Sequence, residues 1–169
     1  MTIEERLQQL EDDRAIRDLK ARYLRACDSQ DPGTVANCLL EDVKVRFEGL
    51  PPFDNRDLFV AAYRQLGCAP GIHDIHHAAN GVITFDSAER ACGQWALSFH
   101  NINLSRRTLT QFGIEYDDVY VKRQGRWWIA ETSSRKKSVL VQVVDEFGNA
   151  RVTAMGHTDA AFGKVAADD

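Results

Sequence analysis

Few features of this sequence point to a secreted or membrane-bound protein. Only four cysteines occur in 169 residues, and none of them stands in a CxxC pair, so a reducing compartment is the simplest expectation. The first residues also lack the apolar stretch of a signal peptide. The longest apolar runs, such as Val139–Val141, are far shorter than the roughly 18 residues of a membrane-spanning helix. We therefore expect a cytoplasmic protein with no membrane partner.

Positive charge and phosphate-binding motifs are scarce as well. The 21 Lys and Arg residues are outnumbered by 25 Asp and Glu, which gives a formal net charge of −4 and disfavours a phosphate-binding surface. A local basic patch could still exist at Ser134–Lys137. No Gly-rich phosphate loop and no Gly-x-Ser-x-Gly motif is present, so nucleotide binding and covalent acyl transfer lack support. We expect no nucleic-acid partner and no cofactor.

The composition itself is that of an ordinary globular protein, with 44% hydrophobic and 27% charged residues. A chain of this length suits one domain and buries roughly two-thirds of the surface of its unfolded form. We expect residues 1–147 to form that domain. Residues 148–169 are rich in Ala, Gly and Asp, and we expect them to form a C-terminal tail or a lid over a pocket.

The first part of the chain has helical periodicity. Thr2–Glu5 is a capping box, and apolar residues at helical spacing predict a helix over residues 3–28. After a break at residues 29–33, a short second helix is predicted over 34–40, capped by Thr34. A third helix is predicted over 55–66 and ends at Gly67.

The rest of the chain alternates as strands do. A short strand is predicted over residues 43–47, followed after the third helix by four long strands over 72–85, 91–104, 110–122 and 126–138. Turns at residues 86–87 and 124–125 make these strands antiparallel neighbours, and a further strand over 139–144 is possible. A sheet of this kind needs helices on one face, so the predicted class is α+β.

Three segments carry a family resemblance. Residues 15–23 with Asp28, the pattern His76-x-x-x-Asn80-x-x-Ile83, and Tyr116-x-Asp118 followed by Gly-Arg-Trp-Trp-Ile occur in this order. Over roughly residues 3–140 the chain resembles the SnoaL-like group of the nuclear transport factor 2-like superfamily. That group includes scytalone dehydratase, bile-acid dehydratases and lindane dehydrochlorinase.

The resemblance implies a fold and an assembly. The fold would be a cone-shaped α+β barrel, in which N-terminal helices pack on a curved, mainly antiparallel sheet that encloses a cavity. Proteins of this family commonly associate through the outer face of the sheet. The resemblance therefore implies a homodimer or a homotrimer, and the sequence does not choose between them.

Asp28 and His76 are the main candidate catalytic residues. Asp28 lies at the edge of the apolar face of the first helix, where it can reach the rim of a cavity or remain a solvated helix-end carboxylate. Adjacent strand residues point to opposite faces, so only one of His76 and His77 can point inward without a bulge. The family pattern selects His76. An inward His77, or a structural role for His76, stays open.

Further residues are expected to bind the substrate. Tyr23 is either a core residue or, as the resembling dehydratases imply, a catalytic hydroxyl that polarises a substrate carbonyl. Trp95, Phe99 and Asn101 share one face of a strand that begins apolar and ends polar, as the wall of a cavity would. Bile-acid dehydratases carry an aspartate where this sequence has Phe99 or His100. The substrate-binding residues that we expect are Asn80, Trp95, Phe99, Asn101, Phe59 and Tyr63.

The histidines near the start of this strand do not predict a metal site. His73, Asp74, His76 and His77 are close in sequence, but neighbours in a strand diverge to opposite faces, whereas zinc ligands must converge. We expect no metal.

These residues lead to one hypothesis and one rival. The hypothesis is a cofactor-independent lyase or isomerase of dehydratase type, acting on a small, largely apolar cyclic molecule. His76 would be the general base, Asp28 would accept its other N–H, and Tyr23 would hydrogen-bond the developing oxyanion or leaving hydroxyl. The rival is a protein of the same fold that binds a small molecule or assembles with itself and performs no reaction.

Overall fold

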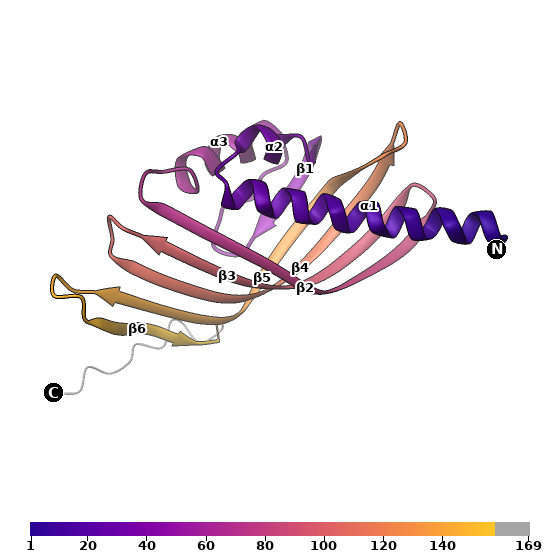
Figure 1. The fold of residues 1–169 in the computed structure, drawn as a ribbon. Coiled ribbons are helices and arrows are strands. Elements are labelled where there is room, and N and C mark those ends of the chain that lie inside the picture. The colour runs from indigo at the N-terminus through magenta and orange to yellow at the C-terminus, as the bar shows by residue number, and fades with distance from the viewer. Residues whose placement is uncertain (158–169) are drawn as a thin grey trace.

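A long first helix and its cap form as predicted. In the computed structural model, which describes residues 1–157, α1 covers Ile3–Asp28. The hydroxyl of Thr2 accepts a hydrogen bond from the backbone N–H of Glu5 at 3.1 Å, and the Glu5 carboxylate accepts from the N–H of Thr2 at 2.7 Å. The helix buries its later turns against the sheet, while its first turns project beyond it (Figure 1). The apolar residues of those first turns, Ile3, Leu7 and Leu10, are therefore exposed.

The second helix differs from the prediction. α2 covers Pro32–Ala36, and its N-cap is Asp31 rather than Thr34. The Asp31 carboxylate accepts hydrogen bonds from the backbone N–H of Thr34 at 3.0 Å and from its hydroxyl at 2.6 Å. Because proline suits the first turn of a helix, the helix begins at Pro32. α3 covers Arg56–Leu66, close to the prediction, with Asn55 as its N-cap.

The strands are longer than predicted. β1 begins at Leu39, and the stretches predicted over 126–138 and 139–144 are one continuous strand. The first hairpin turn lies at residues 88–89 rather than 86–87, while Gln124 and Gly125 both have positive φ, at 53° and 75°, and form the predicted tight turn. The strands of the main sheet are β1 Leu39–Phe47, β2 Ile72–Ser87, β3 Arg90–Asn103, β4 Thr108–Arg123 and β5 Arg126–Val144.

These strands form one curved sheet in the order β1-β5-β4-β3-β2. Pairing is antiparallel throughout except that β1 runs parallel to β5. The predicted α+β class and the mainly antiparallel sheet are confirmed. The sheet remains open rather than closing into a barrel, because β1 and β2 at its two ends are not paired with each other. α1 lies against β2 and β5, and α3 lies against β1 (Figure 1).

Part of the expected C-terminal tail belongs to this sheet. Residues Ala150–Gly156 form β6, which pairs antiparallel with β5. A turn held by Asp145 reverses the chain, since its Oδ1 accepts the backbone N–H groups of Phe147 at 2.9 Å and Asn149 at 2.8 Å. The expectation of a tail or lid is therefore wrong for residues 150–156. For residues 158–169 it lies outside the described residues.

A buried ion pair ties α1 to the sheet. The ammonium of Lys20 lies 2.7 Å from Oδ2 of Asp118, and both side chains are almost fully buried. The hydroxyls of Tyr120 and Thr132 each donate to the same carboxylate at 2.7 Å, and Trp95 donates its indole N–H to the Tyr120 hydroxyl at 3.1 Å. Every member of the cluster has a polar partner, as buried charges require.

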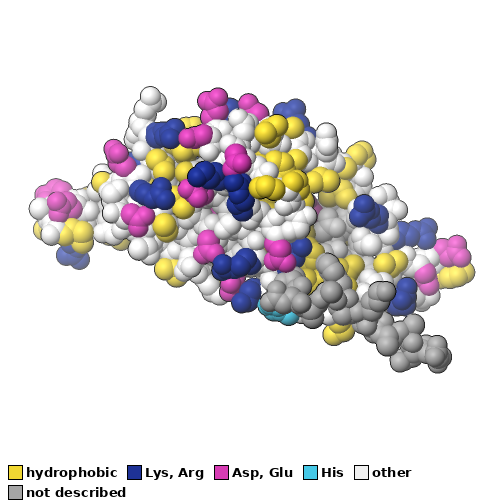
Figure 2. Space-filling model, turned by 180° about the vertical axis from the view of Figure 1, so that it is seen from behind, with side chains coloured by type: hydrophobic (Ala, Val, Ile, Leu, Met, Phe, Trp, Pro, Cys, Tyr) yellow, Lys and Arg dark blue, Asp and Glu magenta, His cyan; other side chains and the backbone are white. Residues whose placement is uncertain are grey.

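The surface has mixed charge. Figure 2 shows the molecule from behind, and in its coloured part dark blue and magenta side chains are interspersed without a large area of one sign. No helix among residues 1–157 is long and apolar enough to cross a membrane.

Candidate active site

A cavity of about 440 Å³ lies between α1, α3 and the concave side of the sheet. Its wall is mainly apolar and includes eight aromatic residues, while polar side chains reach it from β2, β3, β4 and β5 and from Glu48 after β1. An apolar cavity with few polar anchors is typical of a small-molecule site. Its aromatic lining consists of Tyr23, Phe47, Phe53, Phe59, Tyr63, Phe99, Phe112 and Tyr116.

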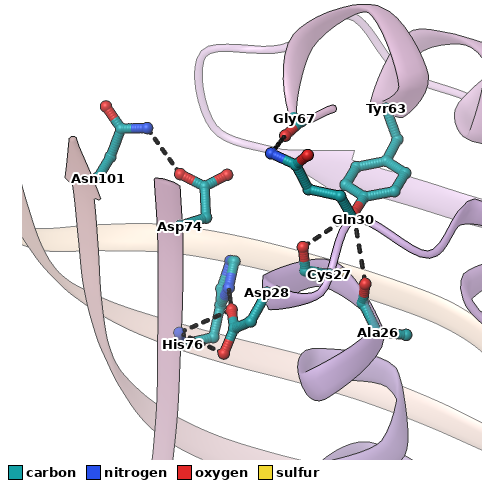
Figure 3. Close-up of polar contacts among 9 residues, drawn as sticks. All are labelled: Ala26, Cys27, Asp28, Gln30, Tyr63, Gly67, Asp74, His76 and Asn101. Carbon is teal, nitrogen blue, oxygen red and sulfur yellow. Dashed lines mark hydrogen bonds and ion pairs between the residues drawn. The ribbon is translucent and has the colours of Figure 1, made fainter. Parts of the chain in front are cut away.

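His76, which lines this cavity, contacts Asp28 at the end of α1 (Figure 3). His76 Nδ1 lies 2.6 Å from Oδ1 of Asp28, and the backbone N–H of His76 donates to the same carboxylate at 3.0 and 3.2 Å. His76 lines the cavity and packs its ring 4.7 Å from that of Phe99. His77, on the opposite face of β2, is exposed. The alternation of β2 therefore turns His76 inward, as predicted.

The carboxylate defines the protonation of the ring. An ionised carboxylate only accepts hydrogen bonds, so the short contact assigns a proton to Nδ1 of His76. In the neutral ring, the lone pair is then on Nε2. Nε2 has no hydrogen-bond partner among residues 1–157. The pair thus consists of a base, His76, that is oriented by a carboxylate, Asp28.

The position of Asp28 is electrostatically unfavourable without His76. Asp28 is the last residue of α1, where the helix dipole disfavours a negative charge by about 0.3–1 kcal/mol. The two N–H groups of His76 offset this by hydrogen bonding to the carboxylate. Gln30 fixes the turn that follows, because its amide donates to the carbonyl of Gly67 at 3.2 Å (Figure 3) and to that of Ile72 at 2.8 Å.

Tyr23 is a buried residue of the cavity wall. Burial is the main cause that raises its pKa well above the ordinary value, and the nearby Cys27 adds to the effect. Burial likewise raises the pKa of the Cys27 thiol to about 12. Tyr23 therefore keeps its proton at neutral pH and can act only as a hydrogen-bond donor or acceptor, not as an anion.

A second carboxyl group on β2 was not predicted as a site residue. Asp74 lines the cavity two positions before His76 and so shares its face of the strand. Asn101, expected to bind substrate, lies across from it on β3 and donates its amide to Oδ1 of Asp74 at 2.6 Å (Figure 3). Burial is the main cause that raises the pKa of Asp74. Once the family pattern had turned His76 inward, the period of two along the strand would also have selected Asp74.

The other predicted wall residues divide into two groups. Phe59, Tyr63 and Phe99 line the cavity as expected. The hydroxyl of Tyr63 donates to the carbonyl of Cys27 at 2.9 Å (Figure 3), which ties α3 to the end of α1. Tyr63 therefore contributes its ring to the wall while its hydroxyl is engaged by the backbone.

Asn80 and Trp95 do not lie on the cavity wall. Asn80 is exposed and has a φ of 52° in an irregular stretch where the register of β2 shifts between Ala79 and Val82. The bulge breaks the alternation from which an inward Asn80 was inferred. Trp95 belongs to the buried cluster around Asp118, because β3 carries it away from the cavity end of the sheet.

The described part of the chain contains no group of three or more His, Cys, Asp or Glu residues that could hold a metal ion. His73 and His77 are exposed, whereas His76 faces the cavity. The four histidine and aspartate residues at the start of β2 are therefore divided between its two faces.

Comparison with solved structures identifies the fold. A scytalone dehydratase-like protein from Novosphingobium aromaticivorans superposes with a TM-score of 0.73 at 22% identity, covering 78% of this chain and 88% of that one. A hexachlorocyclohexane dehydrochlorinase, LinA-type3 from Novosphingobium barchaimii LL02, gives 0.72 at 20% identity over 79% and 91%. ActVI-ORFA from Streptomyces coelicolor gives 0.62 at 13% identity over 72% and 94%.

At these identities the likeness establishes the fold, which is the nuclear transport factor 2-like fold. A comparison with curated proteins gives no match. Residues 8–133, which include Tyr23, Asp28, Asp74 and His76, match the family model described as the SnoaL-like domain. This chain belongs to the SnoaL-like family.

Proposed function

We propose that this protein is a cofactor-independent lyase or isomerase of dehydratase type that acts on a small, largely apolar cyclic molecule in the aromatic cavity. The observation that carries the proposal is the 2.6 Å contact between His76 Nδ1 and Asp28 at the cavity wall. A base held by a carboxylate, with its second nitrogen unengaged by the described residues, is the arrangement that proton abstraction needs.

His76 is the general base in this proposal. Its Nε2 takes a proton from a carbon next to a carbonyl group, and the imidazolium that forms is stabilised by Asp28 on the opposite side of the ring. Asp28 also keeps the ring in one tautomer and one orientation. A carboxylate in this role supports the base without taking up its proton.

Tyr23 is the electrophilic group. Its protonated hydroxyl donates a hydrogen bond to the carbonyl oxygen, on which negative charge develops as the C–H proton leaves. The raised pKa of Tyr23 is consistent with this, because an ionised tyrosine would repel an oxyanion. Phe59, Phe99 and the ring of Tyr63 supply apolar contacts that hold the rest of the substrate.

The family supports the reaction class. Two of the similar structures are named as a dehydratase and a dehydrochlorinase, and both names denote eliminations. At identities of 22% and 20% neither name transfers a substrate to this chain. From these relatives we carry over only the class of reaction. The apolar nature of the substrate is inferred from the lining of this cavity.

The experiment is turnover of a panel of cyclic ketones that carry a hydroxyl or halogen β to the carbonyl. His76→Gln should lower kcat by about 10²–10⁴, the usual contribution of a positioned base. His77→Gln is the matched control, because His77 is adjacent but exposed on the other face of β2, and it should keep wild-type turnover. If His76→Gln keeps most of the activity, the assignment is wrong, and a binding protein of the same fold becomes the better account.

A further inference from the structure

Asp74 occupies a place in the cavity that the proton abstraction by His76 does not use. Its side chain and that of His76 project from the same face of β2, about 7 Å apart along the strand. That separation places two titratable groups at different points along one small substrate. A base and a second carboxyl group in one apolar cavity can serve two separate proton transfers.

One hydrogen bond orients the carboxyl group of Asp74. The Asn101 amide donates to Oδ1 at 2.6 Å (Figure 3). Oδ2 has no hydrogen-bond partner among residues 1–157. One oxygen is therefore engaged and the other is available to a ligand.

The surroundings of Asp74 favour its protonated form. Removal from water is the largest effect, and the charge of Asp28 on α1 acts in the same direction, so the pKa of Asp74 is raised. The Asn101 hydrogen bond and the nearby His76 and His73 oppose the shift without cancelling it. From α3, Tyr63 also faces the carboxyl group, and it is held protonated by burial.

We propose that Asp74 is the general acid of this site, positioned by Asn101, and that it protonates a hydroxyl group that leaves the substrate as water. This rests on the proposed function, in which His76 is the base. Loss of a hydroxyl group needs an acid because hydroxide is a poor leaving group, the pKa of water being about 15.7. Loss of a halide or a carboxylate needs no such proton.

The step balances as an elimination. His76 Nε2 takes the proton from the carbon next to the carbonyl, and the C–H electron pair becomes the new C=C bond. The C–O bond breaks, its electron pair stays with oxygen, and Asp74 transfers its proton to that oxygen, which leaves as water. The imidazolium of His76 then loses a proton to solvent and the Asp74 carboxylate regains one, so the protein returns to its starting state.

Two probes that differ only in the leaving group test the proposal. These are 3-hydroxy-1-tetralone, which loses hydroxide, and 3-acetoxy-1-tetralone, which loses acetate; both give 1-naphthol, followed by its absorbance. Asp74→Asn preserves the shape of the side chain and an oxygen for the Asn101 amide. It should lower kcat for the hydroxyl probe by about 10²–10⁴ and for the acetoxy probe by less than about tenfold. Asp86→Asn, an exposed carboxylate on the same strand, is the control and should change neither rate.

The pH profile separates an acid from a structural carboxylate. For the hydroxyl probe, kcat/KM should fall as pH rises through the pKa of Asp74, and this limb should be absent for the acetoxy probe. Asn101→Ala should move the limb to higher pH, since the lost hydrogen bond is one that lowers the pKa of Asp74. A merely structural role for Asn101 would leave the limb in place.

The outcomes distinguish the two proposals. Equal losses on both probes in Asp74→Asn, or wild-type rates on both, would overturn the role of Asp74 while leaving His76 as base. A wild-type protein that converts only the acetoxy probe would also overturn the role of Asp74, because no hydroxyl group is then expelled. Turnover of both probes by His76→Gln would overturn the proposed function itself.

Discussion

At the residue scale, one carboxylate organises the site. Asp28 accepts hydrogen bonds from both the backbone and the ring of His76. The same side chain therefore joins the end of α1 to β2 and sets the tautomer of the base. A residue with both tasks should affect activity far more than folding when its charge alone is removed.

Asp28→Asn tests this separation. The amide can still accept the backbone N–H of His76, but it can no longer stabilise the imidazolium and it favours the wrong ring tautomer. We expect kcat to fall by about 10²–10⁴ with a small change in melting temperature, measured by turnover and circular dichroism. A large loss of stability with kcat unchanged would assign Asp28 to structure alone.

Asp74 should leave a trace in the pH dependence of stability. Its pKa is raised in the folded state above an unfolded value of about 3.9, so the folded state binds the proton more tightly. The favourable contribution of Asp74 to the free energy of unfolding is complete below the pKa of the unfolded state. It is lost as pH rises through the pKa of the folded state. Relative to wild type, Asp74→Asn should gain stability as pH rises through that window, measured by urea unfolding at several pH values. A stability difference that does not change with pH would contradict the raised pKa.

At the element scale, α1 is fixed to the sheet by a buried charge. Lys20 and Asp118 form an ion pair with side-chain exposures of 1% and 0%, so removal of one partner leaves the other charged group without compensation. The cluster lies behind the cavity wall, since the Lys20 ammonium is 4.0 Å from the centre of the Tyr116 ring.

Lys20→Met should therefore be strongly destabilising. We expect a loss of about 3–5 kcal/mol in the free energy of unfolding, and partial recovery in the Lys20→Met/Asp118→Asn double variant, which has no buried charge. Arg14→Met is the control: the Arg14–Asp18 pair is exposed, and its loss should cost less than about 1 kcal/mol. Urea denaturation measures these free energies of unfolding. Similar losses in Lys20→Met and Arg14→Met would contradict the special role of burial.

The prediction from sequence succeeded where local patterns decide and failed where an irregularity intervenes. The family pattern correctly placed His76 on the inward face of β2. Regular alternation from there also placed Asn80 inward, which is wrong, because the bulge after Ala79 cannot be read from spacing. The alternation of β3 placed Phe99 and Asn101 correctly. Alternation does not show how far along β3 the cavity extends. Trp95 was therefore predicted on the cavity wall, whereas it lies in the buried cluster around Asp118.

At the scale of the whole molecule, hydrophobic periodicity correctly predicted the order of helices and strands, and the family resemblance correctly predicted the curved sheet. Composition misled at the C-terminus, where the Ala- and Gly-rich stretch contains β6. Strand pairing depends on partners distant in sequence, and the exposed edge of β5 that recruits β6 is not visible in local composition. The Lys20–Asp118 pair was missed for the same reason, since 98 positions separate the two residues.

The resemblance also leads us to expect self-association through the outer face of the sheet. Several outward apolar side chains, among them Ile75, Ile102 and Met155, are exposed in the single chain. Sedimentation equilibrium should give two or three times the chain mass of 19.0 kDa. A mass of one chain at micromolar concentration would contradict the expectation.

The central claim is that His76, held by Asp28, removes a proton from carbon, and hydrogen exchange measures that step without any leaving group. With 1-tetralone in D₂O, proton NMR follows the loss of the hydrogens next to the carbonyl. We predict that the wild-type protein and His77→Gln accelerate this exchange over buffer, whereas His76→Gln and Asp28→Asn do not. Exchange by His76→Gln at the wild-type rate, or no acceleration by the wild-type protein, would contradict the claim.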